Sequence, residues 1–199
     1  MNSRTAFEVL ADCAGACRRC PHVAAGSAVI GPANGPVPAP ILFVAEAPGH
    51  LGGVRFGVPL WGDRTGKNFR AYCAETGIDL DRAFITNAVL CHPPSSAGRN
   101  RTPRRSEMRA CRDFLRRQIE LVDPTLVVAL GRIALESLGL VTPHSVAFGH
   151  HVAQPRPWGG RHLASLYHPS GQTLGRRSRA DQLRDYRVIA AWQRAVAAR

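Results

Sequence analysis

The sequence predicts an α/β protein, a three-layer α/β/α fold around a central, mostly parallel sheet of four strands. Four short apolar runs recur along the chain, and segments with helical spacing lie between them. This alternation is typical of right-handed βαβ units, whose helices cover both faces of a parallel sheet. No internal repeat or long linker interrupts the 199 residues, so we expect a single domain over 1–199.

The first 40 residues are expected to form an arm that leads into the sheet. Residues 3–20 have the pattern of a short polar helix that runs into a Cys-x-x-Cys pair. Residues 31–40 carry four prolines, which exclude a helix interior. The run Ile41-Leu42-Phe43-Val44-Ala45 then suits a strand buried on both faces.

Loops, helices and strands alternate through the rest of the chain. The expected order is a loop over 46–66, a helix over 66–77, a strand over 83–89, a loop over 91–105, a helix over 105–121, a strand over 126–130, a helix to 138, a loop-rich stretch over 141–160 with room for edge strands, a strand over 163–167 and a helix over 179–198. The helix after 105 is expected to begin with a capping box of Ser106 and Arg109, where Glu would be ideal.

The charge of the chain points to a polyanionic partner. Lys and Arg number 26 against 14 Asp and Glu, for a net charge of +12, and Lys67 is the single lysine. Arginine binds phosphate through two parallel hydrogen bonds and stays charged at cellular pH. Nucleic acid is the partner that this charge favours, although a basic surface can also serve solubility alone.

The sequence predicts a cytoplasmic protein that does not enter a membrane. No apolar run approaches the roughly 20 residues that cross a bilayer, and the N-terminal residues lack the apolar core of a signal peptide. In a reducing compartment, six cysteines favour free thiols or metal ligands over disulfides.

Polar and Gly-rich segments follow three of the predicted strands. Glu46-Ala47-Pro48-Gly49 follows the first strand, Asn87 lies near the end of the second, and His168-Pro169-Ser170 follows the fourth. Each alone could be a turn or a cap. Because ligands bind at the carboxyl ends of strands in open α/β sheets, their convergence predicts a pocket there.

These segments give the chain a resemblance to a known family. Glu46-Ala47-Pro48-Gly49, the stretch from Gly53 to Gly66, Thr86 to Pro94 with Arg99 to Pro103, and Tyr167 to Gln172 stand in the order of the family's motifs. From Cys17 to about Arg177, the chain resembles the iron–sulfur uracil-DNA glycosylases, families 4 and 5 of that superfamily. The resemblance implies base excision repair, in which the N-glycosidic bond of a flipped-out uracil is hydrolysed and an abasic site remains.

The resemblance also assigns roles to single residues. Asn87 would read the Watson–Crick edge of uracil, and His168 would donate to uracil O2, where negative charge builds in the transition state. Glu46 or Asp63 would orient water or offset positive charge on the sugar. Backbone N–H groups around Ala47, Pro48 and Gly49 would add donors.

The sequence departs from the family pattern at two places. Leu60 stands where the family has an aromatic residue that stacks on uracil. Trp61 is adjacent, but side chains alternate in direction along an extended chain, so Trp61 would point away from the base. Leu51-Gly52-Gly53 occupies the positions where family 4 tends to carry a second acid. These departures leave open which acid activates water.

The cysteines provide a candidate metal centre. Cys17 and Cys20 form a Cys-x-x-Cys pair, and Cys91 and Cys111 lie far along the chain. By spacing alone, four thiolates suit either zinc or an iron–sulfur cluster. The resemblance implies a structural [4Fe–4S] cluster on these four cysteines.

Two basic segments are candidates for phosphate contacts in a monomer bound to DNA. The first contains Arg99, Arg101, Arg104 and Arg105, and the second contains Arg176, Arg177 and Arg179 beside Ser170. Such contacts position a protein without reading sequence. Both segments could instead be solvated loops.

The sequence is also compatible with three other functions. Leu60 motivates a broader glycosylase that acts on hypoxanthine or xanthine. Leu60 and the missing second acid also allow a DNA-binding protein without catalysis. A nucleotide-binding enzyme ranks last because neither a G-x-x-x-x-G-K-[ST] nor a G-x-G-x-x-G pattern follows a strand.

Overall fold

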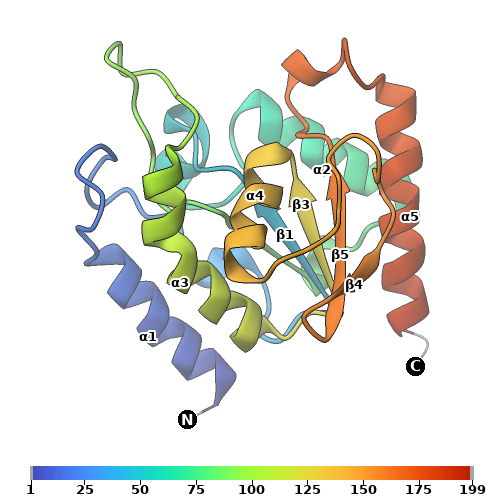
Figure 1. The fold of residues 1–199 in the computed structure, drawn as a ribbon, viewed down its shortest axis with the longest axis horizontal. Coiled ribbons are helices and arrows are strands. Elements are labelled where there is room, and N and C mark those ends of the chain that lie inside the picture. The colour runs from blue at the N-terminus through green and yellow to red at the C-terminus, as the bar shows by residue number, and fades with distance from the viewer. Residues whose placement is uncertain (1, 198–199) are drawn as a thin grey trace.

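The computed structural model describes residues 2–197, in which helices cover both faces of a five-stranded sheet (Figure 1). The strands are β1 Ile41–Ala45, β2 Ala83–Asn87, β3 Leu126–Leu130, β4 Arg156–Trp158 and β5 Arg161–Leu166. Their order across the sheet is β2-β1-β3-β5-β4, and every pairing is parallel except that of β4 with β5. The predicted α/β class and mostly parallel sheet are confirmed.

The predicted number of strands was wrong by one. β4 is a three-residue edge strand in which Trp158 lies opposite Arg161 of β5. It contains Pro157, which an edge position tolerates because no second neighbour needs its missing N–H group. So short a segment with a central proline carries no alternating pattern, so the sequence marked only a loop with room for edge strands.

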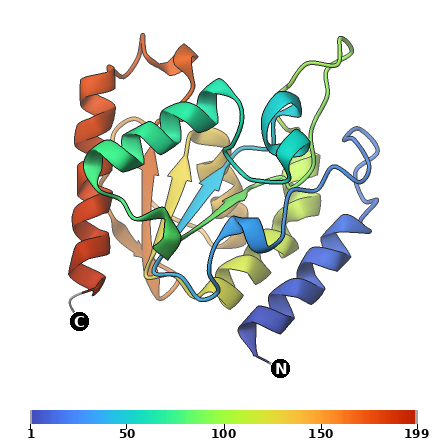
Figure 2. The same cartoon turned by 180° about the vertical axis from the view of Figure 1, so that it is seen from behind.

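Five helices form the two outer layers of the fold. They are α1 Ser3–Gly15, α2 Arg64–Thr76, α3 Arg105–Val122, α4 Arg132–Val141 and α5 Arg179–Ala197. Phe69 of α2 and Tyr186 of α5 pack with Phe43 on one face of the sheet. Leu42 points to the other face, which α1, α3 and α4 cover (Figure 1), whereas Figure 2 shows α2 in front of the sheet. Within residues 2–197, no helix is long and apolar enough to span a membrane.

The end of α1 and the cap of α3 differ from the expected ones, and α4 continues to Val141, beyond the expected end at 138. α1 ends at Gly15, so Cys17 and Cys20 lie in a loop and not in the helix expected to run to residue 20. The capping box of Ser106 and Arg109 was wrong. Instead, the Glu107 carboxylate accepts a 2.7 Å hydrogen bond from the backbone N–H of Arg104, one residue before α3 begins.

The register of the parallel strands brings their carboxyl ends to one edge. Ala45 of β1 lies opposite Asn87 of β2, and Leu130 of β3 lies opposite Leu166 of β5. The loops that follow these strands therefore gather at the same edge, at the top of Figure 1. This is the edge at which open α/β sheets bind ligands.

Candidate active site and cysteine cavity

A small cavity of about 80 Å³ opens at the carboxyl edge of the sheet. Seven of the eight residues predicted for catalysis or substrate binding line it: Ala47, Pro48, Gly49, Leu60, Asp63, Asn87 and His168. The eighth, Glu46, lines a wider groove of about 670 Å³ that shares His168 and Thr65 with the cavity. The sequence therefore singled out residues that the fold brings together.

Asn87 offers an unused amide to this cavity. It is the last residue of β2, and its side chain is 2% exposed. Its Nδ2 has no hydrogen-bond partner among the described residues. Burying an amide without a partner is unfavourable, so such a group in a cavity wall points to a bound molecule as its partner.

His168 is held rigidly where β5 leads into the next loop. Its carbonyl accepts hydrogen bonds of 2.8 Å from both the Ser170 N–H and the Thr173 hydroxyl. Asn68 of α2 donates a 2.9 Å bond to the next carbonyl, that of Pro169. A Cβ atom placed on Gly131 would lie 3.1 Å from the His168 Cβ, so a larger residue there would push the imidazole out of place.

The charge state of His168 follows from its surroundings. Burial lowers the pKa of the imidazole below its usual value, and the negative charge of Asp63 only partly opposes this shift. The ring is therefore neutral near pH 7. A neutral imidazole still carries one N–H group and can donate one hydrogen bond.

Asp63 has a structural task that the sequence did not reveal. Its Oδ1 accepts a 2.8 Å hydrogen bond from the Gly66 N–H and caps α2. Its Oδ2 faces the loop after β1, where a Cβ atom on Gly52 would lie only 2.5 Å away. Asp63 thus caps α2 and lies close against this loop, as well as lining the cavity.

Glu46 lies directly after β1 and lines the wider groove. Burial raises the pKa of its carboxyl group, and the Thr102 side chain partly opposes this shift. Its backbone carbonyl accepts a 3.1 Å hydrogen bond from the Val89 N–H, which fixes the residue beside the end of β2. A carboxylate with a raised pKa is a better proton acceptor than an exposed one.

Leu60 lines the cavity in an uncommon backbone conformation. Its φ angle is 50°, in the left-handed region that seldom suits a branched residue. The adjacent Trp61 does not line the cavity; it is 43% exposed, and the Arg70 guanidinium lies 4.2 Å from the centre of its ring. The wall of the cavity at this point is aliphatic, as the sequence suggested.

Comparison with known proteins agrees with this geometry. The model of the "Uracil DNA glycosylase superfamily" matches residues 32–193. The chain belongs to this superfamily. It is 34% identical to the type-4 uracil-DNA glycosylase of Thermotoga maritima, over 89% of this chain and 87% of that protein. It is 34% identical to the type-5 uracil-DNA glycosylase of Thermus thermophilus, over 79% and 84%.

Within this uracil-DNA glycosylase fold, the Arg101 guanidinium is bound entirely by groups of the protein itself. Its five N–H groups donate to the carbonyls of His22, Pro94 and Thr102 and to both carboxylate oxygens of Glu107, at 2.6 to 3.1 Å. The Glu107 side chain is 3% exposed. A guanidinium has five donors, so Arg101 has none left for a phosphate.

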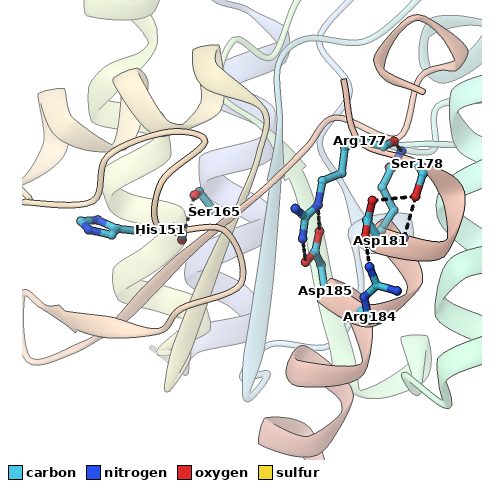
Figure 3. A network of polar contacts seen from close by, with 8 residues as sticks. His151, Ser165, Arg177, Ser178, Asp181, Arg184 and Asp185 are labelled. Atoms are coloured by element: carbon cyan, nitrogen blue, oxygen red, sulfur yellow. Dashed lines mark hydrogen bonds and ion pairs between the residues drawn. The ribbon is translucent and has the colours of Figure 1, made fainter. Parts of the chain in front are cut away.

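The other predicted phosphate ligands are distributed differently. Ser170 lines the groove, whereas Arg104, Arg176 and Arg177 do not. Figure 3 shows Arg177 paired with Asp185 of α5 through two hydrogen bonds, of 2.9 and 2.5 Å. The same view shows Ser178 and Arg184 contacting Asp181, which lies one turn before Asp185 in α5. Arg177 therefore holds the loop after β5 against α5.

The four predicted metal ligands line one cavity of about 200 Å³. They are Cys17, Cys20, Cys91 and Cys111. Burial raises the pKa of the Cys111 thiol to about 12, and burial with neighbouring cysteines raises that of Cys91. Without a positive centre these thiols stay protonated, and a metal centre would stabilise their thiolates.

The spacing of these thiols differs from that of a single-ion site. Among residues 2–197, no three His, Cys, Asp or Glu side chains are placed to hold one metal ion. Tetrahedral zinc with bonds of about 2.3 Å would draw its sulfurs to within about 4 Å of one another. The four thiols line their shared cavity without such a compact grouping.

Sequence reasoning missed three residues that the fold places at the site. Asn100 lines both the cavity and the groove, and its Oδ1 accepts a 3.0 Å hydrogen bond from the His50 N–H. Thr102 lies beside Glu46, and Arg64 lines the groove from the start of α2. Asn100 and Thr102 belong to the motif segment from Arg99 to Pro103, in which the sequence assigned a role only to the arginines.

Proposed function

We propose that this chain hydrolyses the N-glycosidic bond of uracil in DNA and leaves an abasic site. The observation that carries the proposal is the cavity of about 80 Å³, which is lined by Asn87 with its unpaired Nδ2, by the neutral His168 ring and by Leu60. The relatives from Thermotoga maritima and Thermus thermophilus, which are uracil-DNA glycosylases, also support the proposal.

The roles of the side chains follow from hydrogen-bond chemistry. An amide presents an N–H donor and a C=O acceptor, which match O4 and N3–H of uracil, whereas cytosine presents the opposite pattern. The His168 N–H would donate to O2 as negative charge grows there, which stabilises the transition state more than the substrate. Glu46 would orient the attacking water or stabilise positive charge on the sugar, and Asp63 would support it from the cavity wall.

A direct assay tests the activity. The protein in excess is mixed with a duplex that carries one uracil, and alkali then cleaves the strand at abasic sites. Strand cleavage is the expected result. An intact strand would contradict the proposal and would favour a DNA-binding protein without catalysis.

A variant tests the recognition role of Asn87. In Asn87→Asp the carboxylate loses the N–H donors and gains an acceptor for the amino group of cytosine. We expect weaker excision of uracil and a gain of excision from cytosine in the same duplex. Unchanged uracil excision would remove Asn87 from base recognition.

Leu60 favours a second candidate function. An aliphatic wall makes no π-stacking contact and so discriminates less between flat bases than an aromatic wall. Excision of hypoxanthine or xanthine at rates near that of uracil would identify a broader deaminated-base glycosylase. The Leu60→Phe variant should then shift the preference toward uracil.

The cofactor in this proposal is a structural [4Fe–4S] cluster held by Cys17, Cys20, Cys91 and Cys111. Its support is the shared 200 Å³ cavity and the soft sulfur ligands, which such clusters require. The cluster would tie the arm over 1–40 to the loop that carries Cys91. About four irons per chain in anaerobically purified protein are expected, and stoichiometric zinc would contradict the assignment.

In this proposal the enzyme acts on DNA as a cytoplasmic monomer. The net charge of +12 supports DNA as the partner. The six cysteines, which form no disulfide, support a reducing compartment. Light scattering of the protein with and without a short duplex tests the monomer, since a dimer would double the scattering mass.

A further inference from the structure

The groove beside the cavity needs a cation if a DNA strand is to lie in it. Its wall includes three side chains that can carry positive charge: Arg64, Arg101 and His168. Hydroxyl and amide groups of the loop after β5, from Ser170 to Thr173, line the same wall. The charge state and free donors of these three side chains decide which of them can bind a phosphate.

Two of the three cannot serve as the phosphate ligand. All five donors of Arg101 already bind the carbonyls of three residues and the buried Glu107 carboxylate. His168 is neutral near pH 7 because burial lowers its pKa, so it supplies a hydrogen bond but no charge. Arg64 remains.

Arg64 is placed across the groove by the helix that carries it. It is the first residue of α2, it is exposed, and no described residue forms an ion pair or hydrogen bond with its guanidinium. A Cβ atom on Gly171 would lie 3.6 Å from the Arg64 Nε, so the guanidinium reaches over the turn that follows His168.

A second contact holds this side of α2 against the same turn. Asn68 lies four residues after Arg64, on the same face of α2, and its Nδ2 donates a 2.9 Å hydrogen bond to the Pro169 carbonyl. The position of Arg64 is therefore fixed relative to the catalytic edge, while its five donors stay free.

We propose that Arg64 binds a phosphodiester group of the DNA strand that carries the target base. This inference rests on the proposed function, since it assumes that the strand lies in this groove. The guanidinium fork would bind two phosphate oxygens, and the hydroxyl of the adjoining Ser170, which lines the same groove, would add a neutral donor. Because Thr65 and His168 line both the groove and the cavity, the phosphate lies next to the flipped nucleotide.

The salt dependence of DNA binding tests this assignment. Affinity is measured between about 50 and 200 mM salt on a duplex with a stable abasic analogue, which the enzyme cannot cleave. Each phosphate contact contributes about 0.9 to the slope of log affinity against log salt. We expect Arg64→Ala to flatten the slope by about 0.9 and to weaken binding roughly tenfold.

Two further variants make the test specific. Arg82→Ala removes another exposed arginine, just before β2 at the opposite edge of the sheet, and should leave the slope unchanged. Arg64→Lys keeps the charge without the fork and should restore the slope but not the full affinity. A slope in Arg64→Ala equal to that in Arg82→Ala would overturn the inference. Failure of the wild-type protein to release uracil would instead overturn the proposed function, because the binding assay requires no cleavage.

Discussion

At the scale of single residues, His168 combines rigidity with neutrality. The turn after β5 fixes its backbone through hydrogen bonds to the carbonyls of His168 and Pro169. Burial lowers the pKa of the ring and keeps it uncharged. Its remaining N–H group can donate a hydrogen bond to the negative charge that grows on uracil O2. A preorganised donor of this kind stabilises a transition state because it does not reorganise during the reaction.

Removing this donor should slow the chemical step. We expect His168→Ala to reduce the single-turnover rate of uracil excision by about 10²–10³, or roughly 2.7–4 kcal/mol. DNA affinity should change much less, because the imidazole carries no charge toward phosphate. Rapid-quench measurement with protein in excess gives the rate. A reduction of less than about tenfold would make His168 a structural histidine.

The pH dependence of excision should reflect two groups on its acid side. Glu46 must be ionised to act on water, and burial raises its pKa, so its contribution is lost as pH falls through that raised value. His168 must stay neutral, and its lowered pKa keeps it so until the pH falls below its usual range. The rate should therefore rise from acid pH to a plateau near neutrality.

The variant Glu46→Gln separates the two groups. It cannot ionise, so the acid side of its rate profile should retain only the step from His168, at a lower plateau. Single-turnover rates between about pH 4 and 8 measure this. An unchanged profile in Glu46→Gln would exclude Glu46 from the reaction.

Sequence motifs predicted positions at this scale better than they predicted partners. Asn87, His168 and Leu60 were placed in one pocket because a motif and the end of a strand together locate a residue. The partners of Asp63 and Arg101 were missed, since side-chain geometry decides them. The His22 carbonyl that binds Arg101, for example, lies 79 positions away in the chain.

At the scale of elements, one ion pair joins three segments of the chain. Arg101 connects the N-terminal arm through His22, its own loop through Pro94, and the first turn of α3 through Glu107. Glu107 in turn binds the backbone N–H of Arg104. The loop between β2 and α3 is long and contains no helix or strand. The hydrogen bonds of Arg101 and Glu107 hold its backbone in place instead.

Breaking this ion pair should be costly. Arg101→Ala leaves the buried Glu107 carboxylate without its partner, and such a loss typically costs about 3–5 kcal/mol. Arg101→Lys should recover only part of this loss, because an ammonium cannot make five hydrogen bonds in a plane. Urea unfolding of the variants measures the free energy of unfolding.

An exposed ion pair on the same helix provides the control. Arg116 and Glu120 of α3 interact through side chains that are 46% and 54% exposed, and Arg116→Ala should change the free energy of unfolding by no more than about 0.5 kcal/mol. If Arg101→Ala were equally mild, the network around Arg101 would not hold the loop.

Strong patterns made most elements predictable, and weak ones did not. The buried parallel strands read as continuous apolar runs, and their positions were predicted within one or two residues. β4 has three residues and a proline, and its pairing depends on β5 being present. The early end of α1 depends on the loop of Cys17 and Cys20, whose position is set by contacts with the segment around Cys91.

At the scale of the whole molecule, the arm is joined to the sheet at both of its ends. Phe7 of α1 packs edge-on against Phe84 of β2, with ring centres 5.3 Å apart. At the other end, the cysteine cavity brings the arm against Cys91 and Cys111. A single domain over 1–199 stays a prediction, and these contacts are its physical basis.

The second of these junctions, at the cysteine cavity, depends on what the four cysteines bind. If the four cysteines hold a cluster, removing one ligand empties a cavity of about 200 Å³ between α1, α3 and the loop of Cys91. A cavity costs about 24 cal/mol per Å³, which gives an upper bound of about 5 kcal/mol before the arm collapses or water enters. For a chain of this size each kcal/mol lowers Tm by about 2–4 °C. We therefore expect Cys17→Ser to lose its iron and to unfold at a Tm lower by up to about 10–20 °C, with faster proteolysis before residue 40. Cys13→Ser is the matched control, because Cys13 is exposed on α1 and does not line the cavity. Equal iron content and equal Tm in the two variants would show that the arm is held by its apolar packing alone.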